Sequence, residues 1–438
     1  MIHNTIKLSL AAFLLPGMLY AQNIKKLSLQ EAIELGITNS KNLKLSQSKI
    51  DEAVSKLESV KDNALPTASA SFLYNHAEIP TNKLSVGGAD PIHLPNRADA
   101  FIGTAAVEQL VYGGGKLKYA EASTKLLTDV ARLDADKNKE EVSYAVINTY
   151  YSLFKVLQSK KVVAQNLESI AGQLKQSQRF FEQGIVTKND VLRFQLQQAN
   201  VSLTEMEIEN NRKVINYNLD ILLGLDETTA IEIADPDNAL KTVSPLSSYM
   251  DLALSNRQEL KQVDLQNKVA DINIKSIQAN TLPTVGVGAN LYYINPSGKF
   301  IPPTNQYIVP MTLGANISWN IGTLWTNKNK VTEARIQQKN VSIQKDILSD
   351  QVKTEINKNY QDYQLTLSKI KVLETSIAQA TENDNLLASK YKNNVASATD
   401  RIDAETLLYQ AKINLELAKA DAGLAYYTLL KSTGKISQ

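Results

Sequence analysis

Few side chains in this chain of 438 residues have the types and spacing that enzyme chemistry needs. There is no cysteine, and of the three histidines only His76 and His93 are candidates for a metal pair, which we set aside as weak. The run GGGK at 113–116 lacks the spacing of a phosphate-binding loop, so we interpret it as a bend between a strand and a helix. No nucleophile–base arrangement is indicated. We therefore predict that the protein is not an enzyme and needs no cofactor and no metal.

Two polar turns have a clearer chemical pattern. In GIVTKNDVL (184–192) Thr187 precedes Asp190 by three residues, and in NVASATDRI (394–402) Ser397 precedes Asp400 by three. A hydroxyl and a carboxyl at this spacing resemble a capping box, which satisfies free backbone N–H groups at the start of a helix. Both turns are therefore predicted to begin a helix.

The same turns also contain signals that end the preceding helix. Gly184 and Asn394 stand where that helix must finish in left-handed geometry, which these two residue types tolerate. Each turn is thus predicted to join two antiparallel helices. Helix capping does not account for Asp403, which lies three residues after Asp400 on the same helix face.

These turns belong to an internal duplication. Residues 28–224 and 247–434 follow one order: amphipathic helix, Leu-Pro, two strands, a very long helix, a polar turn and a return helix. Pro66 and Pro283 mark the helix-to-strand boundaries, because proline cannot continue a helix. The predicted organisation is a signal peptide (1–21), a first repeat (22–224; strands about 67–76 and 100–112, helical hairpin 115–224), an equatorial linker (225–246), a second repeat (247–434; strands about 284–294 and 307–321, helical hairpin 327–432) and a tail (435–438).

The N-terminus has the pattern of an export signal. Lys7 supplies a positive charge, LSLAAFLLPGML an apolar core, and Leu19-Tyr20-Ala21 a cleavage site. The apolar run is shorter than the roughly 20 residues that span a bilayer. The mature protein is therefore expected to be exported, with no later transmembrane helix.

The strands indicate a membrane sheet. In the last one, Val309, Met311, Leu313, Ala315, Ile317, Trp319 and Ile321 alternate with polar and small residues. Each predicted strand approaches the roughly 9–11 residues that a tilted membrane strand needs, and the loops 77–97 and 294–306 are long. Four strands cannot close a barrel, and an open sheet edge in lipid is costly. Several chains must therefore each contribute a sector.

The long helices carry coiled-coil seams. Between Gly115 and Gln183 there is no proline, so a helix of roughly 100 Å is possible at ~1.5 Å per residue. The return helix has one seam with the residues Leu192, Leu196, Ala199, Leu203 and Met206, and a second with Val201, Ile208, Ile215 and Leu222. Two seams on one helix predict neighbours on both sides, as in a ring of helices. The net charge of +2 gives no support for nucleic-acid binding.

Taken together, these features resemble the outer-membrane efflux protein (TolC) family over essentially the whole mature chain. The resemblance rests on the duplication, on the G-x-x-x-x-x-D-V-L turn at 184–192, on EQLVYGGGK (108–116) and on TDRIDAETLLYQAK (399–412). It implies a mainly α fold with a membrane β-barrel sector: a homotrimer with a 12-stranded barrel in the outer membrane and an α-helical coiled-coil tunnel in the periplasm.

The resemblance also implies a function and partners. Family members are passive exit ducts of tripartite efflux or type I secretion systems. They conduct substrates from an inner-membrane pump of the RND or ABC type, and a periplasmic adaptor (membrane fusion) protein binds their helical tips. The barrel would contact outer-membrane lipid. A different class remains as the alternative: a structural coiled-coil envelope protein or adhesin with a β-barrel anchor.

The family's functional positions can be placed on this chain. Asp400 and Asp403 match the aspartate rings that narrow the closed pore, and Asp190 and Tyr391 match contacts that close the tip. The residues implied to contact the adaptor are Gly184, Ile185, Val186, Thr187, Asn394, Val395, Ala396 and Ser397. Ala396 stands where the family often has an arginine, and Arg401 lies further along the helix.

Overall fold

The computed structural model describes residues 24–78, 80–85, 87–94, 96–236, 243–296 and 307–436. The signal peptide predicted at 1–21 lies outside these residues. In chain order the elements are β1 (Ile24–Leu27), α1 (Leu29–Asn39), α2 (Lys41–Asp62), β2 (Thr67–Glu78), β3 (Lys83–Leu84), β4 (Ile92–His93), β5 (Arg97–Tyr112), α3 (Lys116–Glu182), α4 (Lys188–Leu223), β6 (Ala230–Ile233), α5 (Leu246–Asn256), α6 (Gln258–Gln278), a 3₁₀ turn (Ala279–Thr281), β7 (Thr284–Pro296), β8 (Met311–Ser318), α7 (Thr323–Lys392) and α8 (Ala398–Ser432).

The chain forms two compact units, and both units contain parts of both sequence repeats. We call them the sheet unit and the tip unit. The sheet unit comprises Lys41–Glu141, Val243–Tyr360 and Leu429–Gln438, and the tip unit comprises Met1–Ser40, Val142–Thr242 and Gln361–Thr428. The helices α3 and α7 contribute residues to both units.

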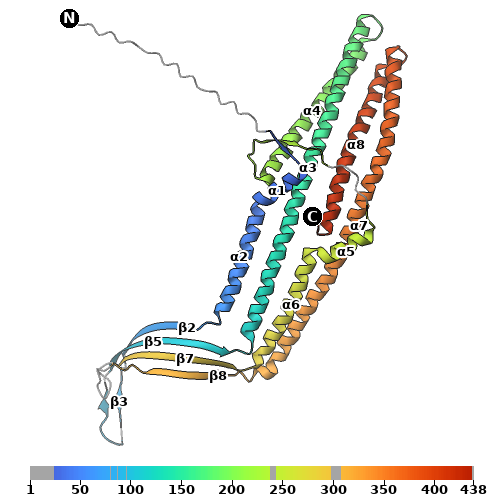
Figure 1. Ribbon diagram of the computed structural model, residues 1–438. Coiled ribbons are helices and arrows are strands. Elements are labelled where there is room, and N and C mark those ends of the chain that lie inside the picture. The colour runs from blue at the N-terminus through green and yellow to red at the C-terminus, as the bar shows by residue number, and fades with distance from the viewer. Residues whose placement is uncertain are drawn as a thin grey trace, which may run out of the picture. The chain divides into compact units, whose positions relative to one another are not determined.

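The sheet unit is built on a four-stranded antiparallel sheet in the order β2-β5-β7-β8 (Figure 1). Each repeat supplies one hairpin, and the pairing of β5 with β7 joins the two. Thr67 pairs with Glu108, and Thr284 with Ser318, so all four junctions with helices lie at one end of the sheet. The prediction of four strands, two from each repeat, is confirmed, and they form one sheet.

The strand limits differ in detail from those predicted. β5 starts at Arg97 instead of 100, because its first residues pair with the end of β2. β8 starts at Met311 instead of 307 and ends at Ser318 instead of 321. Pro310 precedes Met311 and has no N–H group to donate to a ladder. The first long loop also holds a small hairpin of β3 and β4 that was not predicted.

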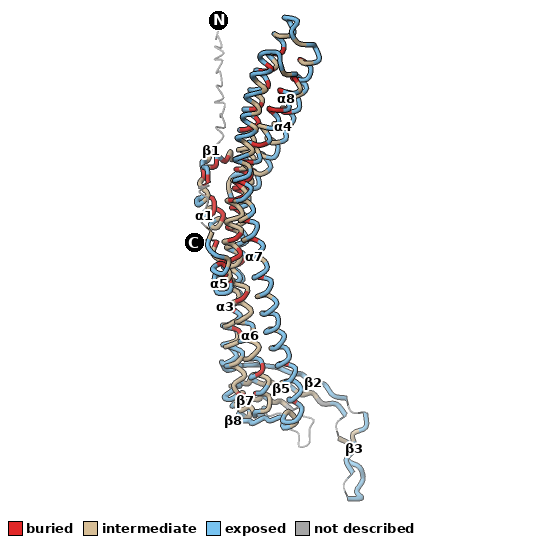
Figure 2. Tube along the Cα trace, turned by 90° about the vertical axis from the view of Figure 1, so that its right-hand side faces the viewer, coloured by how far each residue is buried: buried red, intermediate tan, exposed pale blue. Residues whose placement is uncertain are grey.

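The sheet hides almost none of its side chains. Every residue of β2 and of β8 is exposed, and Figure 2 draws the strands in pale blue and tan. Phe72, Leu313 and Ile317 are 68%, 77% and 75% exposed. A sheet with such apolar residues on its surface requires a partner surface or lipid against it.

The bend from β5 into α3 uses the glycine run. Gly114 and Gly115 have φ of +67° and +81°, and α3 begins at the next residue, Lys116. Left-handed geometry at two successive residues is inexpensive only for glycine. The interpretation of GGGK as a strand-to-helix bend is therefore confirmed.

The helices that open each repeat are divided in two, contrary to the single amphipathic helix predicted for each. Ser40 separates α1 from α2, and Arg257 separates α5 from α6, with ψ of 120° and 123° that no α-helix contains. Arg257 stays in place because its guanidinium donates 3.0 Å and 3.2 Å hydrogen bonds to Glu355 Oε2 and the Ser432 carbonyl. These partners are distant from Arg257 in the sequence, so no local sequence pattern predicts the break in the helix.

The tip unit has a core between its long helices. Val163 and Ile170 on α3 pack with Val201 on α4, and the cluster extends to Tyr409 and Ile413 on α8. One of the two seams predicted on α4 therefore faces this core: Val201 is buried, and Ile208, Ile215 and Leu222 are half-buried. The other remains open: its members Leu192, Leu196, Leu203 and Met206 are 50–67% exposed.

The linker 225–246 contributes a strand, which the sequence did not indicate. β6 pairs in parallel with β1, so that Lys25 faces Ile231 and Leu27 faces Ile233. The Tyr150 hydroxyl on α3 lies 3.0 Å and 2.7 Å from the carbonyl oxygens of Leu27 and Ala234. Burial raises the pKa of Tyr150 to about 12, so this hydroxyl remains a donor.

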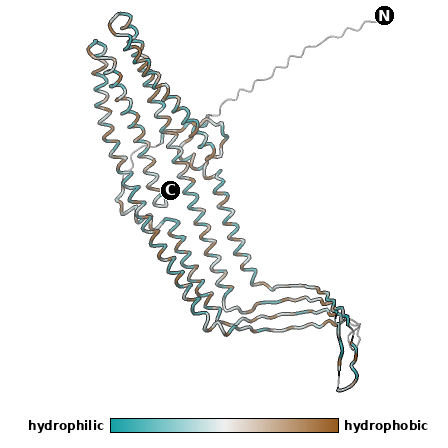
Figure 3. The backbone as a smooth tube through the Cα atoms, turned by 180° about the vertical axis from the view of Figure 1, so that it is seen from behind, coloured by the Kyte–Doolittle hydropathy of each residue, from teal (hydrophilic) through white to brown (hydrophobic). Residues whose placement is uncertain are grey.

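Across the described residues, none of the helices is both long enough and apolar enough to cross a bilayer. Figure 3 shows hydrophilic and hydrophobic residues interleaved along them.

Candidate functional site

The first helical tip is a tightly bonded turn between α3 and α4. The Gly184 N–H donates to the Phe181 carbonyl at 2.9 Å, and the Ile185 N–H to the Phe180 carbonyl at 2.8 Å. Gly184 has φ +71°. The Thr187 N–H and hydroxyl both donate to Asp190 Oδ2, at 2.9 Å and 2.7 Å, which completes the capping box predicted for α4.

The second tip repeats this geometry between α7 and α8. The Asn394 N–H donates to the Tyr391 carbonyl at 3.0 Å, and the Val395 N–H to the Lys390 carbonyl at 2.8 Å. Asn394 has φ +60°, the only positive φ of a non-glycine residue among those described. The Ser397 N–H and hydroxyl donate to Asp400 Oδ2 at 3.0 Å and 2.7 Å. Both predicted capping boxes and both left-handed helix ends are confirmed.

The turns leave their side chains open to solvent. Ile185 is 44% and Val395 75% exposed, and Val186 and Ala396 are half-buried. The exposed remainder of the predicted adaptor-contact set consists of Gly184, Thr187, Asn394 and Ser397. An exposed apolar residue at each tip is available for a partner.

The two predicted pore aspartates lie on the surface of α8. Asp400 and Asp403 are both exposed. The pKa of Asp400 is lowered by the hydrogen bonds from Ser397, so this carboxylate holds its negative charge firmly. Asp403 has no capping function and is free to face a lumen or solvent.

The predicted contact between Asp190 and Tyr391 takes another form here. Asp190 is engaged by Thr187, and no hydrogen bond joins it to the Tyr391 hydroxyl in the described residues. Tyr391 is 3% exposed and packs between Phe180 and Phe194, with ring centroids 6.1 Å and 5.8 Å away. Burial raises the pKa of Tyr391, the Ser177 hydroxyl opposes that rise, and the nearby Asp190 charge adds to it. In this state Tyr391 links the two hairpins by packing.

A buried polar network beneath the tips was not predicted. Arg401 on α8, 7% exposed, forms an ion pair with Asp384 on α7. One turn further along α8, Glu405 is 8% exposed and accepts a 2.6 Å hydrogen bond from Gln173 Nε2 on α3. Burial raises the pKa of Glu405, opposed by the Ser169 hydroxyl and the Arg401 charge.

This network borders a cavity of about 150 Å³ inside the tip unit. Asp384, Glu405, Ser169 and Asn166 contribute polar groups to its wall, and Asn166 Oδ1 is buried without a hydrogen-bond partner among the described residues. A polar cavity of this size has room for ordered water, which would satisfy Asn166.

A local signal for the network does exist. On α8 the buried residues Ala398, Ala404, Ala411 and Leu415 follow steps of six, seven and four, and Arg401 and Glu405 fall on the same stripe. Charged residues on the buried stripe of a helix require partners. The stripe predicts that Arg401 and Glu405 have buried partners, but it does not identify these partners as Asp384 and Gln173.

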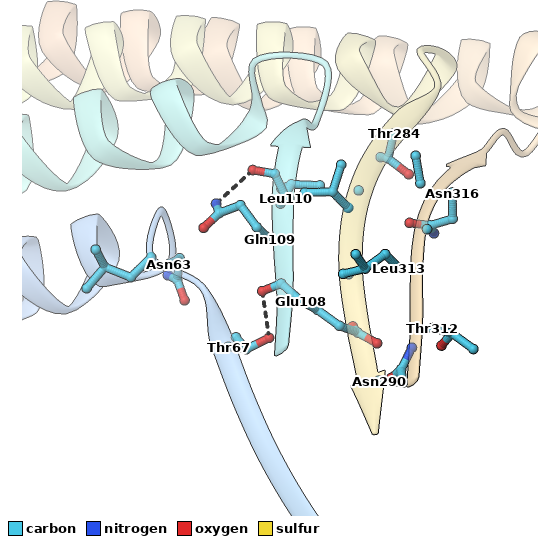
Figure 4. A pocket seen from close by; sticks show the side chains of 16 residues that line it. Asn63, Thr67, Glu108, Gln109, Leu110, Thr284, Asn290, Thr312, Leu313 and Asn316 are labelled. Atoms are coloured by element: carbon cyan, nitrogen blue, oxygen red, sulfur yellow. Dashed lines mark hydrogen bonds between the residues drawn. The ribbon is translucent and has the colours of Figure 1, made fainter. Parts of the chain in front are cut away.

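The sheet unit offers a second candidate surface. Side chains of antiparallel partners point to the same face, and at the end of the sheet near the helices the register separates a mostly apolar face from a mostly polar one. We define the polar face by Thr67, Ser69, Ser71, Thr104, Glu108, Gly286, Gly288, Asn290, Thr312, Gly314 and Asn316. A cavity of about 470 Å³ opens there, lined by Glu108, Asn290, Thr312 and Asn316 among others (Figure 4).

The two histidines stand in different strands, β2 and β4. His76 Nδ1 lies 2.6 Å from Asp99 Oδ1, whereas His93 is in β4, paired with Lys83. Within the described part of the chain, no cluster of three or more histidine and acidic side chains could hold a metal ion.

Part of this chain matches a known protein family in sequence. The sequence model of the family described as "Outer membrane efflux protein" matches residues 249–435. A search of curated protein sequences finds no match.

Several solved structures share the fold. The outer membrane protein VceC of Vibrio cholerae is 16% identical, with a TM-score of 0.76, and the match covers 93% of this chain and 97% of that one. The Campylobacter jejuni CmeC outer membrane channel is 14% identical, with a TM-score of 0.76 over 94% and 87% of the two chains. The open state of the Neisseria gonorrhoeae MtrE outer membrane channel is 14% identical, with a TM-score of 0.70 over 93% and 89%.

Proposed function

We propose that the protein is a passive exit duct of the outer membrane, because residues 249–435 match the family model described as "Outer membrane efflux protein". Its strands form a sector of a membrane β-barrel, and its long helices form a sector of a periplasmic tunnel. Cargo is delivered by an energised pump in the inner membrane, since a β-barrel and coiled coils have no energy source of their own.

The observation that carries this proposal is the two-faced sheet with open edges. β2 and β8 each pair with one strand only. In lipid, every unsatisfied edge group costs several kcal/mol, and single-chain barrels begin at about eight strands. The sheet therefore needs further copies of the same chain to close. Three copies of four strands make the 12-stranded barrel of the family.

The helices support the same assembly. One seam of α4 packs within the chain through Val201 and Ile208. The residues of the second seam, Leu192, Leu196, Leu203 and Met206, are 50–67% exposed. An apolar stripe of this length along a water-exposed helix is unfavourable unless another helix covers it. A neighbouring protomer in a homotrimer provides that helix.

The tips are the proposed docking site for a periplasmic adaptor. Both turns present the same backbone geometry and an exposed apolar residue, Ile185 in the first and Val395 in the second. A trimer would display six such turns, three of each kind. We assign Gly184–Thr187 and Asn394–Ser397 to this contact.

Asp400 and Asp403 are the proposed gate. In a trimer they form two rings of three carboxylates, which concentrate negative potential at the tunnel entrance and favour cations over anions. The hydrogen bond between Glu405 and Gln173 and the packing of Tyr391 hold the two hairpins together in the closed state. Opening requires that both contacts separate.

Conductance separates the duct from its rival, a coiled-coil spacer or adhesin with a barrel anchor. The purified protein in planar bilayers is expected to carry a cation-selective current, and Asp403→Ala to reduce the preference for cations. Asp350→Ala, an exposed aspartate on α7, serves as the matched control. A protein that inserts and yet carries no current in any state would be a spacer, and unchanged selectivity in Asp403→Ala would remove the gate assignment.

A further inference from the structure

The polar face of the sheet has a single charged residue. Among the described strand residues, the register places Thr67, Ser69 and Ser71 of β2, Thr104 of β5, Asn290 of β7, and Thr312 and Asn316 of β8 on this face together with Glu108. The other charged residues of β2 and β5, Glu78, Arg97 and Asp99, fall on the opposite face at the loop end. A lone carboxylate on an otherwise neutral wall determines the local potential of that wall.

The neighbours of Glu108 leave room for its side chain. Its cross-strand partner on β7 is Gly288, and a Cβ atom added there would lie 3.5 Å from Glu108 Cγ. The side chain of Glu108 therefore lies across the glycine, and Figure 4 shows it extending toward Asn290. At Gly286 an added Cβ would stand 2.6 Å from Asn316 Oδ1. Glycines thus form a trough that any side chain would fill.

The trough is rich in oxygen acceptors. Asn290 pairs with Thr312 across the ladder, two residues beyond the pair formed by Glu108 and Gly288. In the described residues, no side chain forms a hydrogen bond or an ion pair with the Glu108 carboxylate. The cavity of about 470 Å³ therefore contains a carboxylate, an amide and a hydroxyl with no cation of the protein to neutralise them.

We propose that Glu108, with Asn290 and Thr312, forms a subsite in the duct wall that binds the ammonium group of a passing cargo. An ammonium group carries donors and positive charge, and a carboxylate flanked by neutral oxygens satisfies both. The subsite rests on the proposed function, since the polar face becomes a lumen wall only when the barrel closes. In a trimer, three copies form a ring within the barrel that is separate from the aspartates of α8.

Blockade of single channels tests the subsite. The probe is putrescine, a diammonium ion, and neutral butanediol is its control. Glu108→Gln keeps the shape and removes the charge, so the half-blocking concentration of putrescine is expected to rise about tenfold, while butanediol has no effect on either protein. Asn290→Asp adds a second carboxylate to the trough and is expected to lower that concentration.

The matched control is Glu78→Gln on the opposite face of the same sheet, which is expected to leave blockade unchanged. Equal blockade of wild type and Glu108→Gln, in trimers of equal stability, overturns the subsite and leaves the duct intact. A wild-type protein without conductance overturns the proposed function itself, and the subsite with it. A Glu108→Gln protein that loses selectivity for potassium over chloride and also resists putrescine supports the proposal.

Discussion

Gln173 on α3 donates a 2.6 Å hydrogen bond to the carboxylate of Glu405 on α8, and both side chains are more than nine-tenths buried. This bond joins the hairpin of the first repeat to the hairpin of the second, 232 residues apart. Because Asp190 and Tyr391 share no hydrogen bond, Gln173 and Glu405 form the clearest polar link between the two hairpins near the tips.

Removal of this link is expected to loosen the closed state. Glu405→Ala removes one of the two acceptors of Gln173 Nε2 and leaves only the Ser169 hydroxyl at 3.2 Å. The buried N–H group that loses its acceptor costs about 1–3 kcal/mol of stability. Glu405→Gln keeps an acceptor in place and avoids burial of a charge, so it should stay near wild type. Thermal unfolding in detergent measures the first effect. A higher resting conductance in Glu405→Ala than in Glu405→Gln would show that the bond restrains opening, whereas equal conductance would assign it to folding alone.

The buried pair of Arg401 and Asp384 is suited to a double-mutant cycle. Arg401→Met strands the Asp384 carboxylate in a largely buried site, and loss of one partner of a buried pair costs about 3–5 kcal/mol. The double variant Arg401→Met/Asp384→Leu should recover most of that loss. The exposed pair of Lys353 and Asp350 is the control, for which the coupling should be about 0–1 kcal/mol. Additive losses at Arg401 and Asp384 would mean that the pair contributes no coupling.

Asp220 predicts how stability varies with pH. It is fully buried, Oδ2 accepts a 2.8 Å bond from Asn216, and burial raises its pKa from 3.8 to about 6. Between pH 4 and 6 the folded chain keeps a proton that the unfolded chain has lost, so this group makes stability fall as pH rises. Above that window the penalty is constant, at up to about 3 kcal/mol.

Asp220→Asn should therefore be more stable than wild type at pH 8 and similar to it at pH 4, measured as the shift in Tm. Asp226→Asn is the control of opposite sign, because hydrogen bonds from Thr228 lower the pKa of Asp226. Replacing the Asp226 carboxylate should lower the stability of the protein at pH 8. A wild-type Tm that rises from pH 4 to pH 6 to the same extent as that of Asp220→Asn would contradict the assignment.

Two glycines of α3 and its turn should respond oppositely to the same substitution. Gly184 has φ +71°, and an alanine there costs about 1–2 kcal/mol because its Cβ disfavours left-handed backbone. Gly172 lies inside α3 with nothing within 4 Å of an added Cβ, so Gly172→Ala should gain about 1 kcal/mol of helix stability. Denaturant unfolding of both variants measures the difference. Equal changes in stability for Gly184→Ala and Gly172→Ala would show that the turn between α3 and α4 rearranges to accept the alanine.

Much of this fold was predictable because its signals are local. The alternation of apolar and polar residues follows from the pleat of a strand, and the seam of Val201, Ile208, Ile215 and Leu222 follows from the repeat of a helix, so each pattern can be recognised within its own segment. Turn chemistry is equally local: Thr187 with Asp190, and Ser397 with Asp400, need only a spacing of three. The duplication then assembled these signals into one architecture.

Other features required the tertiary structure. β1 pairs with β6 across some two hundred residues, and the sequence of a four-residue strand does not name its partner. The positions of Arg401 and Glu405 on the helix predict that both are buried. Their partners, Asp384 and Gln173, are decided by which faces of the helices pack together. Likewise, Glu108 stands alone on the polar face only in the register that pairs it with Gly288. Periodicity is a property of each segment, whereas strand register and helix packing are determined by the free-energy minimum of the whole chain.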